Sequence, residues 1–328
     1  MALRIGVLST ARIAPAAIIE PARLVEGVQV TAVAARSLSD AAEFAATHGI
    51  ANVLPSYEAL CASDLVDAVY IATPSALHRK WTLCALSNGK HVLCEKPLGA
   101  NAADAATMVA AGQAADRVMM EAFHWRFHPM AQRITELCAE LGSIESATAR
   151  FDIGVIPTSD IRFDLGLGGG ALMDLGVYPL QWVRHVFGTE PVVISANAVQ
   201  APEGIDIVMN ASLAFPTPLG TASAEISCSM EFGVAFEADL TVRGSLGSLH
   251  VRNPLAPQLG NKLTLTTAAG ERSEVAPTST TYEWQLRAFL AAVNDAVPLP
   301  TGGTDSIATM QAVDAIYRAA SMQPRPSA

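Results

Sequence analysis

Small and polar residues follow the first apolar run of the chain, in the turn Ser9–Ala14. The dinucleotide-binding pattern G-x-G-x-x-G aligns its glycines on Ser9, Ala11 and Ala14, so small residues stand at all three positions. Small residues meet the physical demand of that pattern, which is a tight turn and a close approach of the backbone to a pyrophosphate. The first N–H groups of a following helix can also receive phosphate. An ordinary strand–helix turn is the alternative. The predicted cofactor contacts of this turn are Ser9, Thr10, Ala11, Arg12 and Ile13.

Arg36 and Ser37 follow the second predicted strand, with Arg36 standing 22 residues after Ala14. A site specific for NAD usually carries Asp or Glu there, to bond the ribose 2′-hydroxyl. An arginine beside a hydroxyl can instead bind a 2′-phosphate through charge-assisted hydrogen bonds. The pair therefore predicts NADP(H) as the cofactor in preference to NAD(H). A solvated loop charge at Arg36 is the alternative, and NAD would then remain possible.

Two further strand ends carry polar residues. The run Ala68–Ala72 is followed by Thr73, Pro74 and His78, and the run Val92–Cys94 is followed by Glu95, Lys96 and Pro97. Ligands bind at the carboxyl ends of the strands in open α/β sheets, so we predict that these six residues line the cofactor site. The Thr73–Pro74 turn would lie against the nicotinamide. For the opposite charges of Glu95 and Lys96, a solvated strand end is the simpler interpretation.

The first 123 residues alternate short β-branched runs with longer amphipathic ones, which predicts a parallel sheet covered by helices. This part is expected to form a dinucleotide-binding Rossmann domain over 1–123. The predicted strands are Arg4–Leu8, Val30–Ala35, Ala68–Ala72, His91–Cys94 and Val118–Ala122. The predicted helices are Pro15–Val25, Leu38–His48, Ser75–Asn88 and Ala102–Ala115.

The second part, 124–328, is expected to be an α+β domain for substrate binding and oligomerisation. Helices are predicted at Met130–Leu141 and Leu172–Phe187, and a strand at Ser143–Ile153. Four or five strands between Pro191 and Leu265 have no helical pattern between them, so a largely antiparallel open sheet is predicted. Two helices then follow, at Tyr282–Val297 and Thr304–Ala320, and residues 323–328 are expected to fray. With one face of apolar residues left uncovered, the sheet would need a partner, so a homodimer or homotetramer is expected.

The bulk composition narrows the function classes. A formal net charge of −10 argues against a general nucleic-acid binder. The chain holds no apolar run of about 18 residues, so no membrane span is expected. The N-terminus reads as a first strand rather than a signal peptide, and the five cysteines are scattered with no C-x-x-C pair. These features favour reduced thiols in a cytoplasmic protein over disulfides or a zinc site.

Several motifs occur in order along the chain: STARIA at 9–14, ATPSALH at 72–78, GKHVLCEKPLGAN at 89–101, EAFHWRFHP at 121–129 and GGGALMDLGVYPLQWVRHVFG at 168–188. Together they resemble the glucose–fructose oxidoreductase / inositol dehydrogenase (Gfo/Idh/MocA) family, nearest the branch with dimeric dihydrodiol dehydrogenases and NADP-dependent xylose dehydrogenases. The resemblance is specific over residues 1–190 and looser beyond. It implies a Rossmann domain joined to an α+β domain whose open sheet often makes the oligomer interface.

The resemblance also implies that Lys96, in the E-K-P motif, is catalytic, and that a D-x-G-x-Y motif supplies Asp174 and Tyr178. Asp174 and Tyr178 lie four apart in a predicted helix and so share one face. Oxidising an alcohol requires removal of the hydroxyl proton as hydride leaves carbon, and a tyrosine with a pKa of about 10 is a poor base at neutral pH. Lowering that pKa by about two to three units takes roughly 3–4 kcal/mol, which a nearby lysine ammonium in a dry site can supply.

Lys96 would then polarise the substrate oxygen, Tyr178 would carry the proton, and Asp174 would orient Lys96 or the substrate. The alternative makes Lys96 itself the acid–base and leaves Tyr178 to position the substrate. The further predicted substrate contacts are Trp125, Arg126, Phe127 and Arg162. Core packing is the alternative for the aromatic residues among them.

His124 and His128 stand four apart, a spacing that can bind a metal on a helix. No third ligand stands at zinc-binding spacing, and Pro129 ends the stretch, so no metal is expected. The function that the residues predict is an NADP(H)-dependent dehydrogenase or reductase acting on a sugar, polyol or cyclic diol, with the direction left open. The alternative from another class is a catalytically silent NADP(H)-binding sensor or regulatory subunit, which the joint presence of Lys96, Asp174 and Tyr178 disfavours.

Overall fold

A computed structural model describes residues 2–154, 160–201 and 204–328. The described chain divides into two compact units, and each is described here by itself. Unit 1 comprises residues 2–127, 282–307 and 327–328, and unit 2 comprises residues 128–281 and 308–326. These units differ from a single division after residue 123, chiefly because the segment 282–307 belongs to unit 1.

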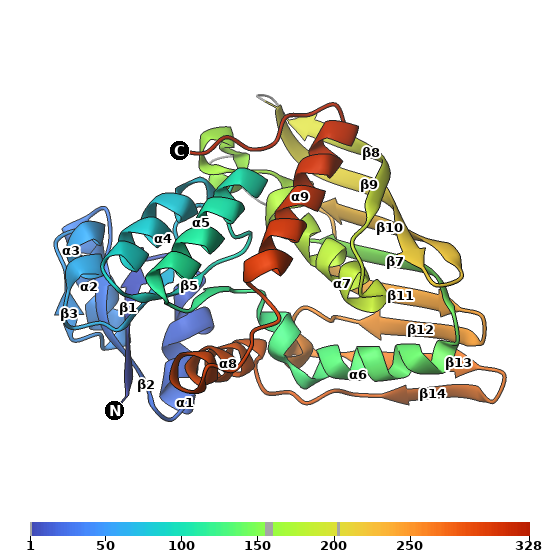
Figure 1. Ribbon diagram of the computed structural model, residues 1–328, viewed down its shortest axis with the longest axis horizontal. Coiled ribbons are helices and arrows are strands. Elements are labelled where there is room, and N and C mark those ends of the chain that lie inside the picture. Colours follow the sequence, from blue (N-terminus) through green and yellow to red (C-terminus); the bar gives the residue numbers. More distant parts are fainter. Residues whose placement is uncertain (1, 155–159, 202–203) are drawn as a thin grey trace. The chain divides into compact units, whose positions relative to one another are not determined.

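Unit 1 is built on a six-stranded parallel sheet in the order β3-β2-β1-β4-β5-β6 (Figure 1). The order reverses between β1 and β4, the point at which open α/β sheets bind ligands. Residues of β1, β4 and β5 are almost all buried, as expected for strands covered on both faces. The strands are β1 (Leu3–Leu8), β2 (Val28–Ala34), β3 (Asn52–Val53), β4 (Ala68–Ile71), β5 (His91–Cys94) and β6 (Met119–Glu121).

The helices of unit 1 between these strands begin at clear local signals. The side chains of Ser37, Ser56 and Asn101 cap α2, α3 and α5 by accepting hydrogen bonds from backbone N–H groups of the first turns. Gly49, with φ of 73°, ends α2 in the left-handed conformation that favours glycine. The helices are a π-helical turn (Pro15–Ile19) that continues as α1 (Glu20–Leu24), α2 (Leu38–His48), α3 (Tyr57–Ala62), a 3-10 turn (Ser75–Leu77) that continues as α4 (His78–Ser87), α5 (Ala102–Ala115) and a 3-10 turn (His124–Phe127).

The helix α8 (Thr281–Asp295) packs into the core of unit 1, although more than 150 residues separate it from β6 along the chain. Its Leu286 and Phe289 are fully buried in one hydrophobic cluster with Tyr70 of β4, Leu93 of β5 and Met120 of β6. A parallel sheet must be covered on both faces, and α8 supplies cover over these three strands. This packing places α8 with the Rossmann sheet rather than with the second half of the chain.

Unit 2 is built on an eight-stranded sheet in the order β14-β13-β12-β11-β7-β10-β9-β8. All neighbours are antiparallel except β7 and β10, which run parallel. The fold is therefore α+β with a largely antiparallel open sheet, as predicted. The strands are β7 (Ile144–Asp152), β8 (Val192–Ala201), β9 (Ile205–Thr217), β10 (Gly220–Ser229), β11 (Glu237–Gly244), β12 (Gly247–Arg252), β13 (Lys262–Thr267) and β14 (Gly270–Glu274).

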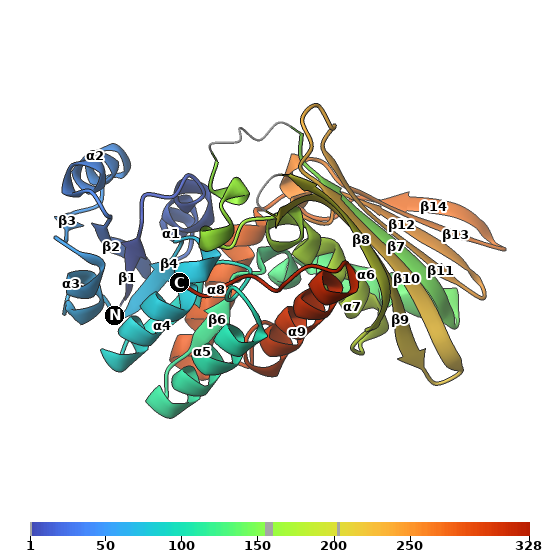
Figure 2. The ribbon, with the colours of Figure 1, turned by 90° about the horizontal axis from the view of Figure 1, so that it is seen from above.

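One face of this sheet packs against helices and the other carries none from the described part of unit 2 (Figure 2). The helices are α6 (Pro129–Cys138), a π-helical turn (Leu172–Gly176) that continues as α7 (Val177–Phe187), and α9 (Gly303–Ala319), of which the residues from 308 belong to unit 2. The bare face is polar, contrary to the apolar face expected from the sequence. A row of paired residues across seven strands shows this: Ser212, Glu225, Thr148, Thr241, His250, Thr264 and Ser273.

The segment after α9 is bonded at several points, so the expectation that residues 323–328 fray is wrong. Arg325 is 2% exposed. In unit 1, Ser327 Oγ donates to Asp104 Oδ1 (2.8 Å), and the Ala328 N–H donates to the Ala76 carbonyl (3.2 Å). A terminal segment is often loose, but here the side chains of Arg325 and Ser327 find buried partners that are distant in the sequence.

Candidate active site

Glu95 and Lys96 stand where β5 ends, and Glu95 is anchored inside unit 1. The Tyr70 hydroxyl donates to Glu95 Oε1 (2.7 Å), and the Lys96 N–H donates to Glu95 Oε2 (3.3 Å). Glu95 is only 9% exposed, Lys96 is half-buried, and the Lys96–Pro97 peptide bond is cis. The Glu95 carboxylate therefore fixes the backbone from which the Lys96 side chain extends.

His78 ties the ends of β4 and β5 together. Its Nδ1 lies 3.0 Å from the Pro97 carbonyl oxygen and its Nε2 lies 2.7 Å from the Thr73 carbonyl oxygen. The side chain is 1% exposed, and this burial lowers the pKa of His78 although the carbonyl contacts oppose the shift. Both ring nitrogens are engaged by the backbone, so His78 supports the turns rather than presenting a nitrogen to a cofactor.

Thr73 offers a group that the described protein does not satisfy. Thr73 is 6% exposed, and its Oγ1 has no hydrogen-bond partner in the described chain. Buried hydroxyls are normally paired, so a lone one at the carboxyl end of a parallel strand fits a ligand contact. Pro74, beside it, is half-buried.

His124 is a neutral neighbour of Lys96. Burial, followed by the positive charge of Lys96, lowers the pKa of His124 to about 3. Its ring packs against Tyr282 of α8, with centroids 4.2 Å apart. An uncharged imidazole here adds no repulsion to the Lys96 ammonium group.

His128 has a different role from His124 despite their spacing. His128 caps α6 in unit 2, where its Nδ1 accepts the Met130 N–H (3.1 Å). Over residues 2–154, 160–201 and 204–328, no cluster of three or more His, Cys, Asp or Glu side chains could hold a metal ion. In the same ranges, no helix has both the length and the apolar character that crossing a bilayer requires.

The turn after β1 has the geometry that the glycine pattern would demand. Ser9 has φ of 90°, a left-handed conformation that glycine normally adopts. Its N–H donates to the Ala34 carbonyl (2.9 Å) and its Oγ to the Ala72 carbonyl (2.8 Å), so two neighbouring strands hold it. Ala14 is fully buried at the start of the π-helical turn. Thr10 and Ala11 are half-buried, and Arg12 and Ile13 are exposed.

Arg36 follows β2 and is exposed, as a residue that contacts a phosphate from solvent must be. Ser37 is half-buried, and its Oγ caps α2 by accepting the Asp40 N–H (3.2 Å). Tyr57 is a neighbour of Arg36 that the sequence did not suggest, and the Arg36 charge and backbone both act on its hydroxyl group. The Tyr57 ring packs edge-on against Trp81, with centroids 4.8 Å apart.

Asp174 and Tyr178 lie on the helix that follows the glycine-rich loop of unit 2. The helix begins with a π-helical turn, so Asp174 lies in that turn and Tyr178 lies in α7, rather than both on a regular α-helix. Arg162 donates through Nε to Asp174 Oδ2 (2.5 Å) and through Nη1 to Asp160 Oδ1 (3.1 Å). Burial lowers the pKa of Arg162, but the two carboxylates outweigh it and the net shift is upward.

Tyr178 is 4% exposed and sits among aromatic rings. Its ring lies edge-on to Phe151 (5.5 Å between centroids) and tilted against Trp182 (6.3 Å). These contacts fix the ring, because neighbouring rings restrict its rotation.

Of the last three residues of the HWRF turn, Trp125 is buried and Arg126 and Phe127 are half-buried. Trp125 is 1% exposed, and Phe127 packs against the hydrophobic cluster of unit 1. Arg126 is half-buried, with its guanidinium carbon 5.5 Å from the Trp125 ring centroid. Trp125 and Phe127 therefore contribute packing, and Arg126 offers the polar group.

Sequence reasoning did not single out Tyr70 and Tyr282, which contact Glu95 and His124 in unit 1. Nor did it single out Asp206 and Arg325, which bond the turn before Asp174 in unit 2. For Tyr70, a hydroxyl inside the apolar run of β4 was an available signal, because a buried tyrosine hydroxyl normally has a partner. The partners of the other three lie far away in the sequence, and no local pattern marks them.

The parallel sheet with strand order 3-2-1-4-5-6 and the tight turn after β1 are features of a dinucleotide-binding domain, and Lys96 stands at the end of one of its strands. The sequence model described as "Oxidoreductase family, NAD-binding Rossmann fold" matches residues 3–123, and the "GFO/IDH/MocA C-terminal domain" matches residues 131–250.

The similar proteins described here match between 69% and 97% of the chain. D-xylose 1-dehydrogenase (NADP(+)) 2 of Haloferax volcanii is 34% identical, over 96% of this chain and 96% of its own length. Trans-1,2-dihydrobenzene-1,2-diol dehydrogenase of Sus scrofa is 36% identical over 69% of this chain and 67% of its own. Among solved structures, the 3-ketoreductase KijD10 of Actinomadura kijaniata, in complex with NADP and TDP-benzene, superimposes with a TM-score of 0.90 at 29% identity, over 97% of this chain and 98% of its own. The chain belongs to the Gfo/Idh/MocA oxidoreductase family.

Proposed function

We propose that this chain is an NADP(H)-dependent oxidoreductase that transfers hydride between nicotinamide and a hydroxyl or carbonyl carbon of a sugar, polyol or cyclic diol. The observation that carries the proposal is Lys96, at the end of a Rossmann strand, in a chain that matches an NADP-dependent xylose dehydrogenase along almost its whole length. The relatives with dehydrogenase and reductase names include both sugar and diol enzymes, which supports the breadth of the substrate class.

Several features of unit 1 fit a bound NADP(H). The Ser9 turn would receive the pyrophosphate, with Thr10, Ala11, Arg12 and Ile13 around it. Arg36 and Ser37 would receive the 2′-phosphate, because no carboxylate stands at the end of β2 to repel it. The buried Thr73 hydroxyl, with Pro74, Glu95, Lys96 and Pro97, would meet the nicotinamide end. His78 belongs to this site as the residue that joins the Thr73 and Pro97 backbones.

The bound cofactor supplies or accepts hydride. In the direction of alcohol oxidation, Lys96 would bind the substrate oxygen and stabilise the negative charge that develops there. Tyr178 would take the hydroxyl proton, and Asp174 with its partner Arg162 would orient substrate hydroxyl groups. Arg126 would add a polar contact, with Trp125 and Phe127 packed around it. In the alternative assignment Lys96 exchanges the proton itself and Tyr178 positions the substrate.

Replacing Lys96 tests both assignments. Lys96→Met removes the ammonium group and should lower turnover of D-xylose with NADP+ by roughly 10²–10⁴-fold, the usual effect of losing an acid–base or charge-stabilising group. NADPH binding, measured by fluorescence titration, should change far less. The matched control is Lys80→Met, because Lys80 is exposed on α4. Near-normal turnover of Lys96→Met would exclude both assignments.

Cofactor preference depends on Arg36 in this proposal. Arg36→Ala should weaken NADPH binding by about 10-fold or more, because a hydrogen bond to a charged group contributes about 1.5–3 kcal/mol. NADH binding should stay within about twofold, because NADH lacks the 2′-phosphate. Isothermal titration of both cofactors on wild type and variant measures the difference. Tighter binding of NADH than NADPH by the wild type would contradict the proposal.

We also propose a homodimer or homotetramer in the cytoplasm. The bare face of the eight-stranded sheet supports the homo-oligomer. So do exposed aliphatic residues on its edge strand β8, namely Val192 (62% exposed), Ile194 (64%) and Val199 (50%). The five cysteines, all free thiols in the structure, fit a reducing compartment.

A further inference from the structure

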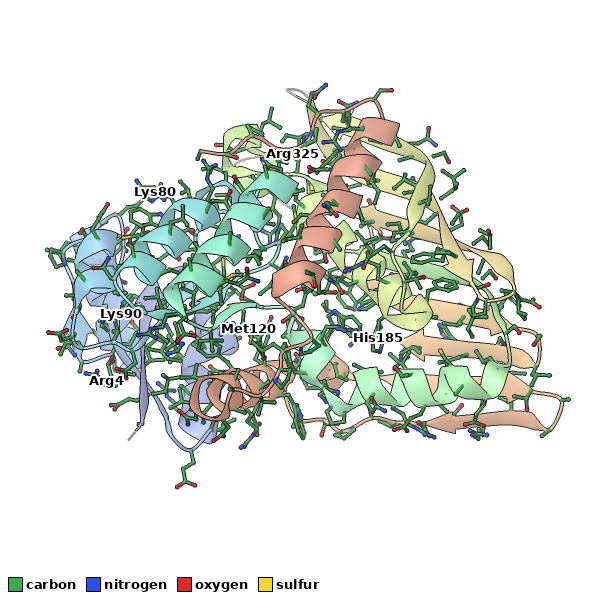
Figure 3. All side chains as sticks on the ribbon, viewed as in Figure 1. Arg4, Lys80, Lys90, Met120, His185 and Arg325 are labelled. Atoms are coloured by element: carbon green, nitrogen blue, oxygen red, sulfur yellow. The ribbon has the colours of Figure 1, made fainter. Side chains whose placement is uncertain are left out.

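A buried arginine far along the chain holds the start of the helix that carries Asp174 and Tyr178. Arg325 lies in the segment after α9 (Figure 3), and its side chain is 2% exposed. Its Nε donates to the Gly169 carbonyl (2.7 Å), its Nη1 to the Gly204 carbonyl (3.3 Å) and its Nη2 to Asp206 Oδ1. The guanidinium also stacks over the Tyr317 ring, 4.3 Å from the ring centroid.

Asp206, the partner of Arg325, is fully buried and bonds the first turn of the helix that carries Asp174 and Tyr178. Its Oδ2 accepts the Leu172 N–H (2.7 Å), and its Oδ1 accepts the Tyr317 hydroxyl (3.1 Å). The first N–H groups of a helix have no partner within the helix, and a carboxylate there is also favoured by the helix dipole. Asp206 therefore caps the helix from a strand 34 residues away.

The glycine-rich loop lies directly on this carboxylate. Gly170 has φ of +133°, and a Cβ added to it would lie 2.1 Å from Asp206 Oδ1. Consecutive glycines leave the loop without side chains that could fix its path. The bonds of the Gly169 carbonyl to Arg325 and of the Leu172 N–H to Asp206 therefore help to set the path of this turn. The Gly169 N–H also donates to the Asp164 carbonyl (2.9 Å), and the Gly170 carbonyl accepts the Asp174 N–H (3.1 Å).

We propose that Arg325 and Asp206 are positioning residues that hold the Gly169–Leu172 turn, and through it Asp174 and Tyr178, in the arrangement needed for catalysis. The inference rests on the proposed roles of Asp174 and Tyr178 in hydride transfer. Because Asp174 lies two residues after Leu172, a shift of this turn moves the carboxylate with it.

Removing the arginine has a definite electrostatic consequence. Burial raises the pKa of Asp206, and the positive charge of Arg325 opposes this shift. In an Arg325→Ala variant the buried carboxylate loses its cation and the Gly169 carbonyl loses its donor. Arg325→Lys keeps the charge but cannot bond Gly169, Gly204 and Asp206 together, since an ammonium group lacks the planar fork of donors.

Hydrogen exchange tests whether the network holds the turn. In Arg325→Ala, amides of 168–176 should exchange about tenfold faster or more, since a lost buried hydrogen bond lowers local protection by at least that factor. In Arg325→Lys, the exchange rate of these amides should lie between those of Arg325→Ala and wild type. The exchange of peptides from β1, β4 and β5 should not change. The control is Arg318→Ala, whose arginine is 63% exposed on α9. Unchanged exchange over 168–176 in Arg325→Ala would overturn the proposal.

Turnover of a sugar, polyol or cyclic diol that the wild-type protein accepts tests whether positioning matters for catalysis. In Arg325→Ala, kcat should fall about tenfold or more while the NADPH dissociation constant stays within about twofold, and guanidinium ion added to the assay should restore part of kcat. A general loss of folding would instead weaken NADPH binding and would not respond to guanidinium. Faster exchange with normal kcat would overturn the positioning role.

The two proposals can fail separately. Wild-type protein that neither oxidises a sugar, polyol or cyclic diol with NADP+ nor reduces the corresponding carbonyl compound with NADPH would contradict the proposed function. The exchange measurement would still decide whether Arg325 holds the turn. If guanidinium ion restored exchange protection in Arg325→Ala, it would support the structural role of Arg325 even if no enzyme activity were found. If Arg325→Ala does not fold, Arg325→Lys and Tyr317→Phe give the same two readings, because Tyr317→Phe removes only the hydroxyl donor to Asp206.

Discussion

Lys96 lies near one charged side chain, the Glu95 carboxylate, and one neutral side chain, the His124 imidazole. Glu95 is held by Tyr70, and His124 is buried against Tyr282. Lys96 therefore has a carboxylate and a neutral imidazole as neighbours. The sequence marked Lys96 as a candidate site residue, and the structure adds its buried neighbours Glu95 and His124.

The lowered pKa of His124 predicts how the stability of the fold depends on pH in acid. The pKa of His124 is lowered to about 3, chiefly by burial and then by Lys96, from an ordinary value of 6.5. Between these two values the unfolded chain binds a proton that the folded chain does not, so stability rises with pH from about 3 to 6.5. This contribution is complete above about pH 6.5 and is lost as pH falls towards 3, and its size is roughly 3–5 kcal/mol.

Urea unfolding at several pH values between 4 and 8 measures this dependence. His124→Gln should be less stable at pH 7.5 but should lose less stability than wild type between pH 7 and pH 4. The control is His48→Gln, at the end of α2, which should follow the wild-type curve. An unchanged slope in His124→Gln would show that this histidine does not bind the extra proton on unfolding.

At the level of elements, local signals predicted most helices and missed the smallest pieces. Leu38–His48 and Ala102–Ala115 have the expected bounds because Ser37 and Asn101 cap them. The two-residue strand β3 and the six-residue helix α3 were not predicted, since such short pieces carry little periodicity. The π-helical turn before α7 was also unexpected, because hydrophobic periodicity does not distinguish it from an α-helical turn.

Gly176 in the D-x-G-x-Y motif has a packing reason. A Cβ at this position would lie 2.8 Å from Cys228 Sγ of β10 and 2.8 Å from Leu172 Cδ1. Gly176→Ala should therefore destabilise the protein by about 1–3 kcal/mol, the usual effect of overpacking a core. Urea unfolding measures the change.

The double variant Gly176→Ala, Cys228→Ala provides the check on the mechanism. Removing the sulfur should recover part of the loss, so the two substitutions should be non-additive. Strict additivity would mean that contact with Cys228 is not the cause.

For the whole molecule, the polar row on the bare sheet face changes how an oligomer would form. Residues such as Thr148, Thr241 and Thr264 offer hydroxyl groups and methyl groups rather than a purely apolar surface. An interface there would bury hydrogen-bonding groups and bridging water, as interfaces of mixed polarity do.

Light scattering at micromolar concentration should give the mass of a dimer or tetramer rather than the 34.3 kDa of one chain. Thr241→Arg, in the middle of the face, should shift the mass towards the monomer, because it places a buried charge in the interface. Leu246→Arg is the control, since Leu246 is 62% exposed in the turn after β11. A monomeric wild type at these concentrations would contradict the oligomer.

The sequence by itself determined the Rossmann pattern, the small residues of the turn after β1, the Arg36–Ser37 pair, and the motifs that make Lys96, Asp174 and Tyr178 candidate site residues. These follow from local periodicity, from strand ends and from motifs, all of which lie within short stretches. Tertiary structure alone decided that α8 completes the core of unit 1, that the bare sheet face is polar, and that Asp206 and Arg325, 119 residues apart, close on the glycine-rich loop. The physical reason is that packing and buried hydrogen bonds join residues distant along the chain, and their partners exist only once the chain has folded.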